Sequence, residues 1–264
     1  MHFVTKLAAT LLLAAACALS YAGTTDIGMV VIHGKWGSPR GPVAPLARAL
    51  EREGFIVSVP EMPWSAQRVY DRSVEDTEAD IDRELAKLRE AGAKHVFVIG
   101  HSLGAAFTLR FATRHTPSGI VAVAPGHRPE GSRYAQAFRE PVSTARALTA
   151  AGRGTELVGF TDLNTGGRQS YLRAPAGPFL SYFDPSGPLH MARNAASVKA
   201  DVPVLWIVPA GEEQPLRSGL VGLFRSLPKH PLTKFVEPEG DHLGAPAASA
   251  RAIVDWIREV AAKN

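Results

Sequence analysis

The sequence predicts an α/β protein of three layers, in which helices flank a mainly parallel central sheet. Short apolar runs recur along the chain without polar alternation, as expected for strands that are buried on both faces. Amphipathic segments with a 3.6-residue period separate these runs. About 240 residues follow the first two dozen, which is enough for one large domain with a substantial core.

The first half of the chain alternates strands and helices regularly. The run IGMVVIHG at 27–34 ends at glycine and is typical of a buried strand. Ser73 suits the N-cap of a helix, and Gly92 suits its C-terminal end. We therefore expect strands at 27–34, 56–63, 94–100 and 119–125, and helices at 42–55, 73–92 and 103–115.

Residues 126–200 interrupt this order and are rich in glycine, proline and arginine. We expect a helix with a proline interruption at 134–152 and an ordered loop at 172–188. A long insertion between two strands commonly forms a lid or a specificity element. We expect a lid or pocket wall, with a structural embellishment as the alternative. Beyond it we expect a strand at 202–210, a helix at 220–228, a strand and loop at 233–242 and a helix at 248–263.

The N-terminus has the pattern of a targeting segment. Lys6 precedes an apolar run from Leu7 to Leu19, and small residues precede and follow Tyr21 in the manner of a cleavage site. The run is too short to cross a membrane, so we expect residues 1–22 to be a removed signal peptide and 23–264 to be the exported domain, periplasmic or secreted. A lipid anchor at Cys17 is the alternative.

The charge pattern argues against a nucleic-acid partner. The formal net charge of the whole chain is +4, and without Lys6 it is +3. This excess is spread along the sequence and forms no lysine or arginine block. The sequence also lacks the HExxH, paired-cysteine and GxxxxGK[ST] motifs of zinc and phosphate sites.

The segment HVFVIGHSLGAAFTLRFA at 95–112 carries the strongest chemical signal. It places Ser102 between Gly100 and Gly104, where a predicted strand becomes a predicted helix. This is the pattern of a nucleophile elbow, whose turn is too tight for side chains at the flanking positions. The elbow would raise the Ser102 hydroxyl above the sheet and aim the backbone N–H of Leu103 at a developing oxyanion.

An early strand ends in His33-Gly34, and together with the elbow this motif resembles the α/β-hydrolase superfamily. The resemblance implies the α/β-hydrolase fold, with 126–200 inserted between the strands that match the family's sixth and seventh core strands. It also implies that the backbone N–H groups of Lys35 and Leu103 form the oxyanion hole. We expect Trp36 to shape the pocket and His33 to support the loop.

The superfamily orders its catalytic residues as serine, acid and histidine along the chain. Its base follows the last strand, and His242 occupies that position within EPEGDHLGAP at 237–246. The other histidines fit this place less well, because they lie in the elbow, at a helix end, in loops or in the insertion; they are His101, His115, His127, His190 and His230.

The acid is harder to assign from the sequence. The family carries it after its seventh strand, which here leads into PAGEEQPL at 209–216. Counting from the proline that begins the strand favours Glu212, with Glu213 second. A second way of counting reaches Gln214, which holds no charge. Asp162 and Asp184 in the insertion are further candidates.

The resemblance implies a serine hydrolase that cleaves carboxylic esters of a small-molecule acyl substrate without a metal or organic cofactor. Thioester or amide cleavage and acyl transfer are alternatives on the same residues, and a non-catalytic binding protein is a further one. In the insertion, Phe179, Tyr182 and Phe183 suggest a partly apolar acyl or alcohol site.

Overall fold

The computed structural model describes residues 26–163 and 169–263. The predicted signal peptide and Cys17 lie outside the described residues. No helix within these ranges combines the length and the apolar composition that crossing a bilayer requires.

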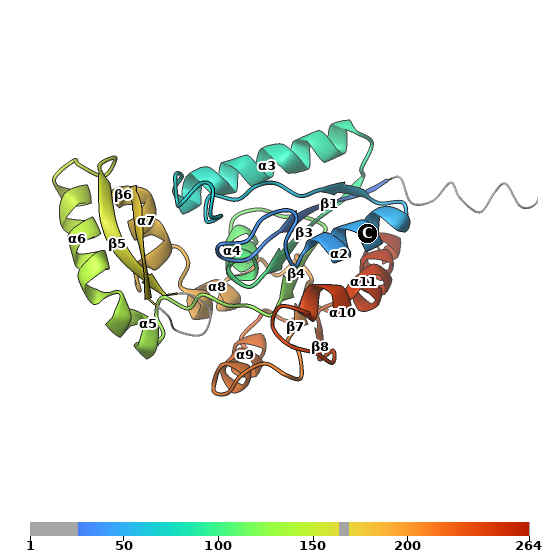
Figure 1. Cartoon of the computed structure of the whole chain (residues 1–264). Helices are drawn as coiled ribbons and strands as arrows, with labels where there is room; N and C mark the ends of the chain where they lie inside the picture. Colours follow the sequence, from blue (N-terminus) through green and yellow to red (C-terminus); the bar gives the residue numbers. More distant parts are fainter. Residues whose placement is uncertain (1–25, 164–168, 264) are drawn as a thin grey trace, which may run out of the picture.

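A parallel sheet forms the centre of the molecule (Figure 1). Within the described residues its strands are β1 (Ile27–Ile32), β2 (Ile56–Ser58), β3 (His95–His101), β4 (Gly119–Val123), β7 (Val204–Ile207) and β8 (Lys234–Val236). Their spatial order is β2-β1-β3-β4-β7-β8, and every neighbouring pair is parallel. The predicted fold class is therefore confirmed.

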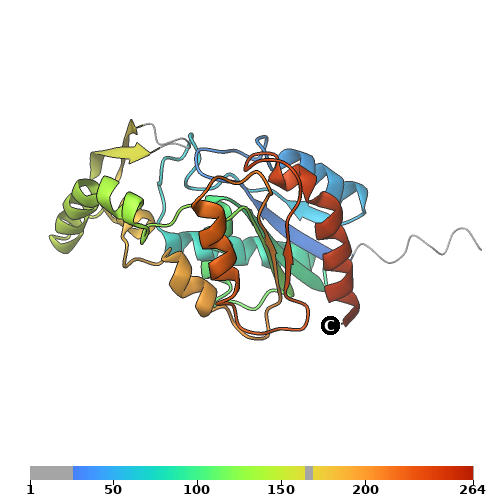
Figure 2. The ribbon, with the colours of Figure 1, turned by 90° about the horizontal axis from the view of Figure 1, so that it is seen from below.

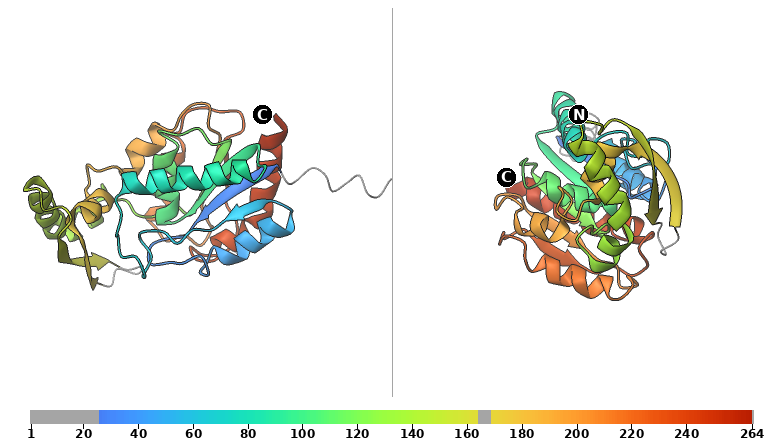
Figure 3. Two further views of the ribbon diagram at one scale, coloured as in Figure 1. Left: turned by 90° about the horizontal axis from the view of Figure 1, so that it is seen from above. Right: turned by 90° about the vertical axis from the view of Figure 1, so that its left-hand side faces the viewer.

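Helices cover both faces of the sheet, so the molecule has three layers (Figures 1 and 3). Along β1, Met29 and Val31 belong to one hydrophobic core, whereas Val30 and Ile32 belong to the other. Because successive side chains of a strand point to opposite faces, this alternation shows that both faces are buried. One face packs against α2 (Ala44–Arg52), α10 (Ala245–Ala248) and α11 (Ala250–Lys263), and the other against α3 (Val74–Glu90), α4 (Leu103–Phe111), α8 (Met191–Ala196) and α9 (Leu216–Phe224).

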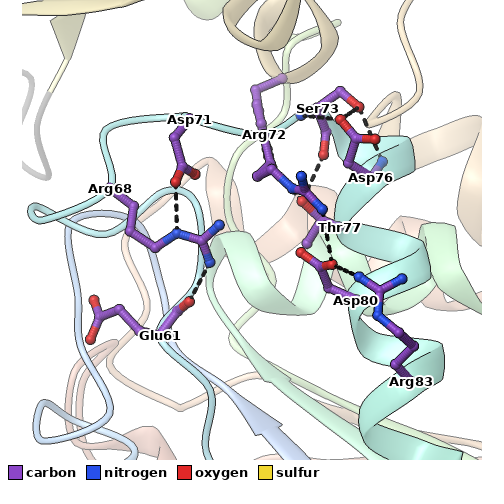
Figure 4. Close-up of polar contacts among 10 residues, drawn as sticks. Glu61, Arg68, Asp71, Arg72, Ser73, Asp76, Thr77, Asp80 and Arg83 are labelled. Atoms are coloured by element: carbon purple, nitrogen blue, oxygen red, sulfur yellow. Dashed lines mark hydrogen bonds and ion pairs between the residues drawn. The ribbon is translucent and has the colours of Figure 1, made fainter.

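The loop that joins β2 to α3 replaces most of the predicted strand 56–63 (Figure 4). Its backbone is held by a side chain, since the Arg68 guanidinium donates to the Glu61 carbonyl at 2.7 Å. Ser73 then caps α3 as predicted, and its Oγ accepts the Asp76 N–H at 3.1 Å. Side-chain partners therefore satisfy one carbonyl group of the loop and one N–H group in the first turn of α3.

Residues 126–200 run between β4 and β7, which are neighbours in the sheet. Besides α8, this insertion forms α5 (Ser132–Ala137), α6 (Arg139–Ala150), an antiparallel pair of β5 (Leu157–Leu163) and β6 (Gln169–Pro175), and α7 (Ala176–Phe183). Figures 1 and 2 show α5, α6, β5, β6 and α7 together at the end of the molecule remote from α11. The role of this region as a lid stays a prediction.

The prediction of an ordered loop at 172–188 is wrong, because much of this segment belongs to β6 and α7. Pro175 is the N-cap of α7, and Pro178 lies in its first turn. Backbone N–H groups in a first turn have no partner within the helix, so proline costs little there. Pro141 likewise lies in the first turn of α6, and the predicted interruption falls at Phe138 instead.

Candidate active site

The turn from β3 into α4 holds Ser102 in a strained conformation. Its backbone has φ 56° and ψ −116°, a left-handed value that costs a non-glycine residue of order 1–3 kcal/mol. A Cβ on Gly100 would lie 2.2 Å from the Gly104 carbonyl oxygen, and one on Gly104 would lie 2.8 Å from the His33 carbonyl oxygen. The two glycines therefore permit a turn that other residues would obstruct, as the motif predicts.

The Ser102 hydroxyl faces His242, which comes from the loop after β8. Ser102 Oγ lies 3.0 Å from His242 Nε2, and His242 Nδ1 lies 2.7 Å from Glu212 Oε2. The Glu212 side chain is only 4% exposed, whereas that of His242 is 20% exposed. A buried carboxylate beside Nδ1 favours the tautomer with its proton on that nitrogen, which leaves Nε2 free to accept the serine proton.

Backbone hydrogen bonds between two loops bring Glu212 to His242. The Ala210 N–H donates to the Pro238 carbonyl and the Gly211 N–H donates to the Gly240 carbonyl, both at 2.9 Å. These bonds extend the contact between β7 and β8 beyond the ends of the strands. The loop that carries the acid is thus fixed against the loop that carries the histidine.

The other acid candidates lie elsewhere. Glu213 is exposed, and Asp184 pairs with Arg146 at 2.9 Å. Asp162 is fully buried, but its carboxylate contacts Lys35 rather than His242. Glu212 is therefore the one carboxylate of the four that the structure brings to His242.

The loop after β1 carries the predicted oxyanion donor Lys35. Among the described residues, neither the Lys35 N–H nor the Leu103 N–H donates a hydrogen bond, and both residues line the cavity that contains Ser102. His33 supports this loop as predicted: its Nδ1–H donates to the Gly34 carbonyl at 2.8 Å, and its Nε2 accepts the Met62 N–H at 3.1 Å. Two backbone donors are thus available beside the hydroxyl.

Two other histidines near Ser102 are held neutral. Burial, with the charge of His242 adding to it, lowers the pKa of His101 to about 4. Burial and the nearby Lys35 charge lower the pKa of His127 to about 3. His127 donates from Nε2 to the Tyr182 carbonyl at 2.7 Å. Neither ring contacts the serine hydroxyl, so His242 alone of the three is placed to exchange its proton.

Sequence reasoning missed two backbone contacts of this site. His101 donates from Nε2 to the His242 carbonyl at 2.9 Å, and the Gly126 N–H donates to the Ser102 carbonyl at 3.0 Å. Gly126 follows β4, whose carboxyl end adjoins that of β3. Ligand sites of parallel sheets form at these ends, and this rule could have singled Gly126 out.

The cavity at Ser102 has a volume of about 680 Å³. Its apolar lining comes from Leu103, Tyr134, Leu163, Leu216 and Leu243. The expectation that Phe179, Tyr182 and Phe183 would line it is wrong, because all three are buried in the hydrophobic core, where Phe179 stacks on Phe160 and Phe183.

Within the described ranges, no three side chains of His, Cys, Asp or Glu lie close enough together to hold a metal ion.

Comparison with known proteins agrees with the fold. The sequence model of the Alpha/beta hydrolase family matches residues 29–256, which is most of the chain. The chain belongs to the alpha/beta hydrolase family. Among curated proteins, none matches this α/β-hydrolase significantly.

Solved structures resemble this α/β-hydrolase over nearly their whole length. The monoacylglycerol lipase of Paleococcus ferrophilus aligns with a TM-score of 0.63 and 23% identity, over 88% of this chain and 94% of its own. A metagenome-derived lipolytic enzyme aligns with a TM-score of 0.61 and 20% identity, over 89% of this chain and 94% of its own. Est1E of Butyrivibrio proteoclasticus, with ferulic acid bound, aligns with a TM-score of 0.59 and 14% identity, over 89% of each chain. At these identities the likeness establishes the fold.

Proposed function

We propose that this α/β-hydrolase is a serine hydrolase that cleaves carboxylic esters through an acyl-enzyme. The observation that carries the proposal is a chain of two hydrogen bonds. Ser102 Oγ lies 3.0 Å from His242 Nε2, and His242 Nδ1 lies 2.7 Å from Glu212 Oε2. A strained serine, an imidazole within hydrogen-bonding distance of its hydroxyl and a buried acid in this order are what nucleophilic acyl transfer requires.

The first half of the reaction forms the acyl-enzyme. His242 Nε2 takes the Ser102 proton as Oγ bonds to the acyl carbon, and the carbonyl electrons move to its oxygen. The Lys35 and Leu103 N–H groups stabilise this oxyanion, each contributing roughly 10²–10³ in rate. The intermediate then expels the alcohol, which leaves with the proton from His242.

The second half regenerates the enzyme. Water enters the cavity, gives a proton to His242 Nε2 and attacks the acyl carbon. The second tetrahedral intermediate breaks its bond to Ser102 Oγ, which recovers the proton, and the carboxylic acid is released. Throughout both halves, Glu212 stabilises the charged imidazolium and keeps the ring oriented.

An ester is the favoured substrate because the solved structures described above include lipolytic enzymes. The cavity of about 680 Å³, with leucine side chains beside the serine, suits a small or medium apolar acyl or alcohol group. Thioester cleavage, amide cleavage and acyl transfer use the same residues, and a panel of matched ester, thioester and amide substrates distinguishes them.

The proposal is tested by covalent labelling. A fluorophosphonate should add once per chain, on Ser102, because this hydroxyl is activated by His242. Ser102→Ala should take up none and should lose ester hydrolysis, whereas Ser226→Ala, at an exposed position just after the end of α9, should label like the wild type. Intact-mass spectrometry measures the adduct. Wild-type protein that is folded by circular dichroism yet remains unmodified would refute the proposal.

A further inference from the structure

A buried carboxylate of the insertion contacts the oxyanion loop. Asp162, on β5, is fully buried. Its Oδ1 contacts the Lys35 ammonium and accepts the Leu163 N–H at 2.7 Å, while its Oδ2 accepts the Trp36 Nε1–H at 2.9 Å. The carboxylate therefore binds the side chains of both residues that follow His33-Gly34.

The Lys35 side chain is held almost entirely by the insertion. Besides Asp162, its ammonium donates to the Leu163 carbonyl at 2.7 Å and lies over three aromatic rings of the insertion at 5.3–5.9 Å from their centres. The side chain is only 11% exposed. Lys35 thus places its backbone in the oxyanion loop and its side chain inside a different part of the fold.

Two hydrogen bonds within the loop hold the carbonyl side of the Lys35 peptide group: the Gly34 carbonyl accepts the His33 Nδ1–H at 2.8 Å and the Gly37 N–H at 3.0 Å. The Trp36 N–H donates to the Trp64 carbonyl at 2.9 Å, and Trp36 has a left-handed φ of 57°. The Lys35 N–H makes no hydrogen bond in the part of the chain that the structure describes. Its direction therefore depends on the bonds to the Gly34 carbonyl before it and on what fixes the Lys35 and Trp36 side chains after it. Displacement of a catalytic group by about 1 Å can reduce a rate by roughly 10².

We propose that Asp162 is a positioning residue that fixes Lys35 and Trp36, so that the Lys35 N–H points at the oxyanion of the reacting ester. This inference rests on the proposed function. It makes the insertion part of the reaction machinery, because β5 then helps to hold the loop after β1 in the geometry that the oxyanion hole needs.

The hydrogen-bond donors around Asp162 require a carboxylate at this position rather than an amide. Within the described residues, each Asp162 oxygen faces hydrogen-bond donors: Oδ1 faces the Lys35 ammonium and the Leu163 N–H, and Oδ2 faces the Trp36 Nε1–H. An asparagine keeps the size but replaces one oxygen with an NH₂ group, which would face a donor in either orientation. Asp162→Asn also leaves the buried Lys35 ammonium without its counter-charge, which is costly in a low-dielectric site.

The first experiment compares Asp162→Asn with the wild type on p-nitrophenyl butyrate, well below the melting temperature of either. Rates are expressed per serine titrated by fluorophosphonate, so that misfolded protein does not count. We expect kcat to fall by about tenfold or more and KM to change by less than about threefold, because an oxyanion contact is made in the transition state. Glu156→Gln is the matched control, since its carboxylate pairs on the exposed surface with Arg153, just before β5.

Lys35→Met, which should lower kcat in the same way, keeps the inference testable if Asp162→Asn folds poorly, and the two variants together form a double-mutant cycle. Lys35→Met removes the side-chain charge and keeps the backbone N–H. If Lys35 and Asp162 act as one unit, the double variant loses no more kcat than the more impaired single variant. Losses that multiply would overturn the inference.

The outcomes separate this inference from the proposed function. If the wild type neither labels nor hydrolyses the ester, the proposed function fails. If the wild type is active and Asp162→Asn keeps its kcat, or changes KM alone, only the positioning role of Asp162 fails.

Discussion

Glu212 and Glu213 are adjacent in the loop after β7, but their environments differ sharply. Glu212 is buried and contacts His242 Nδ1, whereas Glu213 is exposed. The difference follows from the hydrogen bonds that join this loop to the loop after β8 and turn one side chain inward. A carboxylate that orients an imidazole must be buried beside it, which only Glu212 satisfies.

Glu212→Gln and Glu213→Gln should therefore give different rates. We expect Glu212→Gln to lower kcat by about 10²–10⁴-fold, because an amide favours the wrong imidazole tautomer and does not stabilise the cation. Glu213→Gln should stay within about threefold of the wild type. Steady-state hydrolysis of one p-nitrophenyl ester measures both. Equal rates for the two variants would contradict the assignment of Glu212.

At the scale of elements, the junction of β3 and α4 depends on close backbone packing. Gly104 lies in the first turn of α4, and a Cβ there would come within 2.8 Å of the carbonyl oxygens of Ile32 and His33 at the end of β1. Neither backbone oxygen can move far, because β1 is a central strand of the sheet. A methyl group would therefore push α4, and Ser102 with it, away from the oxyanion loop.

Gly104→Ala should lower the free energy of unfolding by about 1–3 kcal/mol, as overpacking does, and slow the fluorophosphonate reaction. The matched control is Gly222→Ala in α9, where a Cβ would meet no atom within 4 Å. There the substitution should raise the free energy of unfolding by about 0.5–1 kcal/mol, since alanine favours a helix. Urea denaturation measures both. A Gly104→Ala protein as stable as the wild type would show that the junction can relax.

At the scale of the whole molecule, the insertion and the sheet share one hydrophobic core. Tyr182 of α7 lies in the same buried cluster as Phe107 of α4, with Trp64 between them in contact with both rings. Two polar contacts join the same regions: Tyr182 Oη lies 3.0 Å from Thr77 Oγ1, and the Val74 N–H donates to Ser181 Oγ at 3.0 Å. The insertion thus has no separate core of its own.

The protein should therefore unfold in one cooperative transition. Thermal unfolding followed by far-ultraviolet circular dichroism, tryptophan fluorescence and residual esterase activity should give the same midpoint, because loss of the insertion would open the core around α3 and α4. An earlier transition in activity alone would contradict this expectation and indicate an insertion that opens independently.

Much of this architecture follows from local pattern. Apolar runs buried on both faces predict the strands, and helical periodicity with capping residues predicts most helices, because these signals depend on neighbours within a few positions. The elbow glycines around Ser102 belong to the same kind of signal, whereas the resemblance to the α/β-hydrolases is what indicates His242 and favours Glu212. The signal peptide stays a prediction.

Contacts between distant parts of the chain carry no such local pattern. The choice of Glu212 over Glu213 depends on which way a loop turns against β8, and the burial of Phe179 and Tyr182 depends on α7 packing beside α3. Asp162 lies 127 positions from Lys35, and no periodicity or motif links them. These contacts form only when the folded backbone brings the partners together. A charge buried in a core without a partner is costly, so Asp162 and Lys35 stabilise each other there.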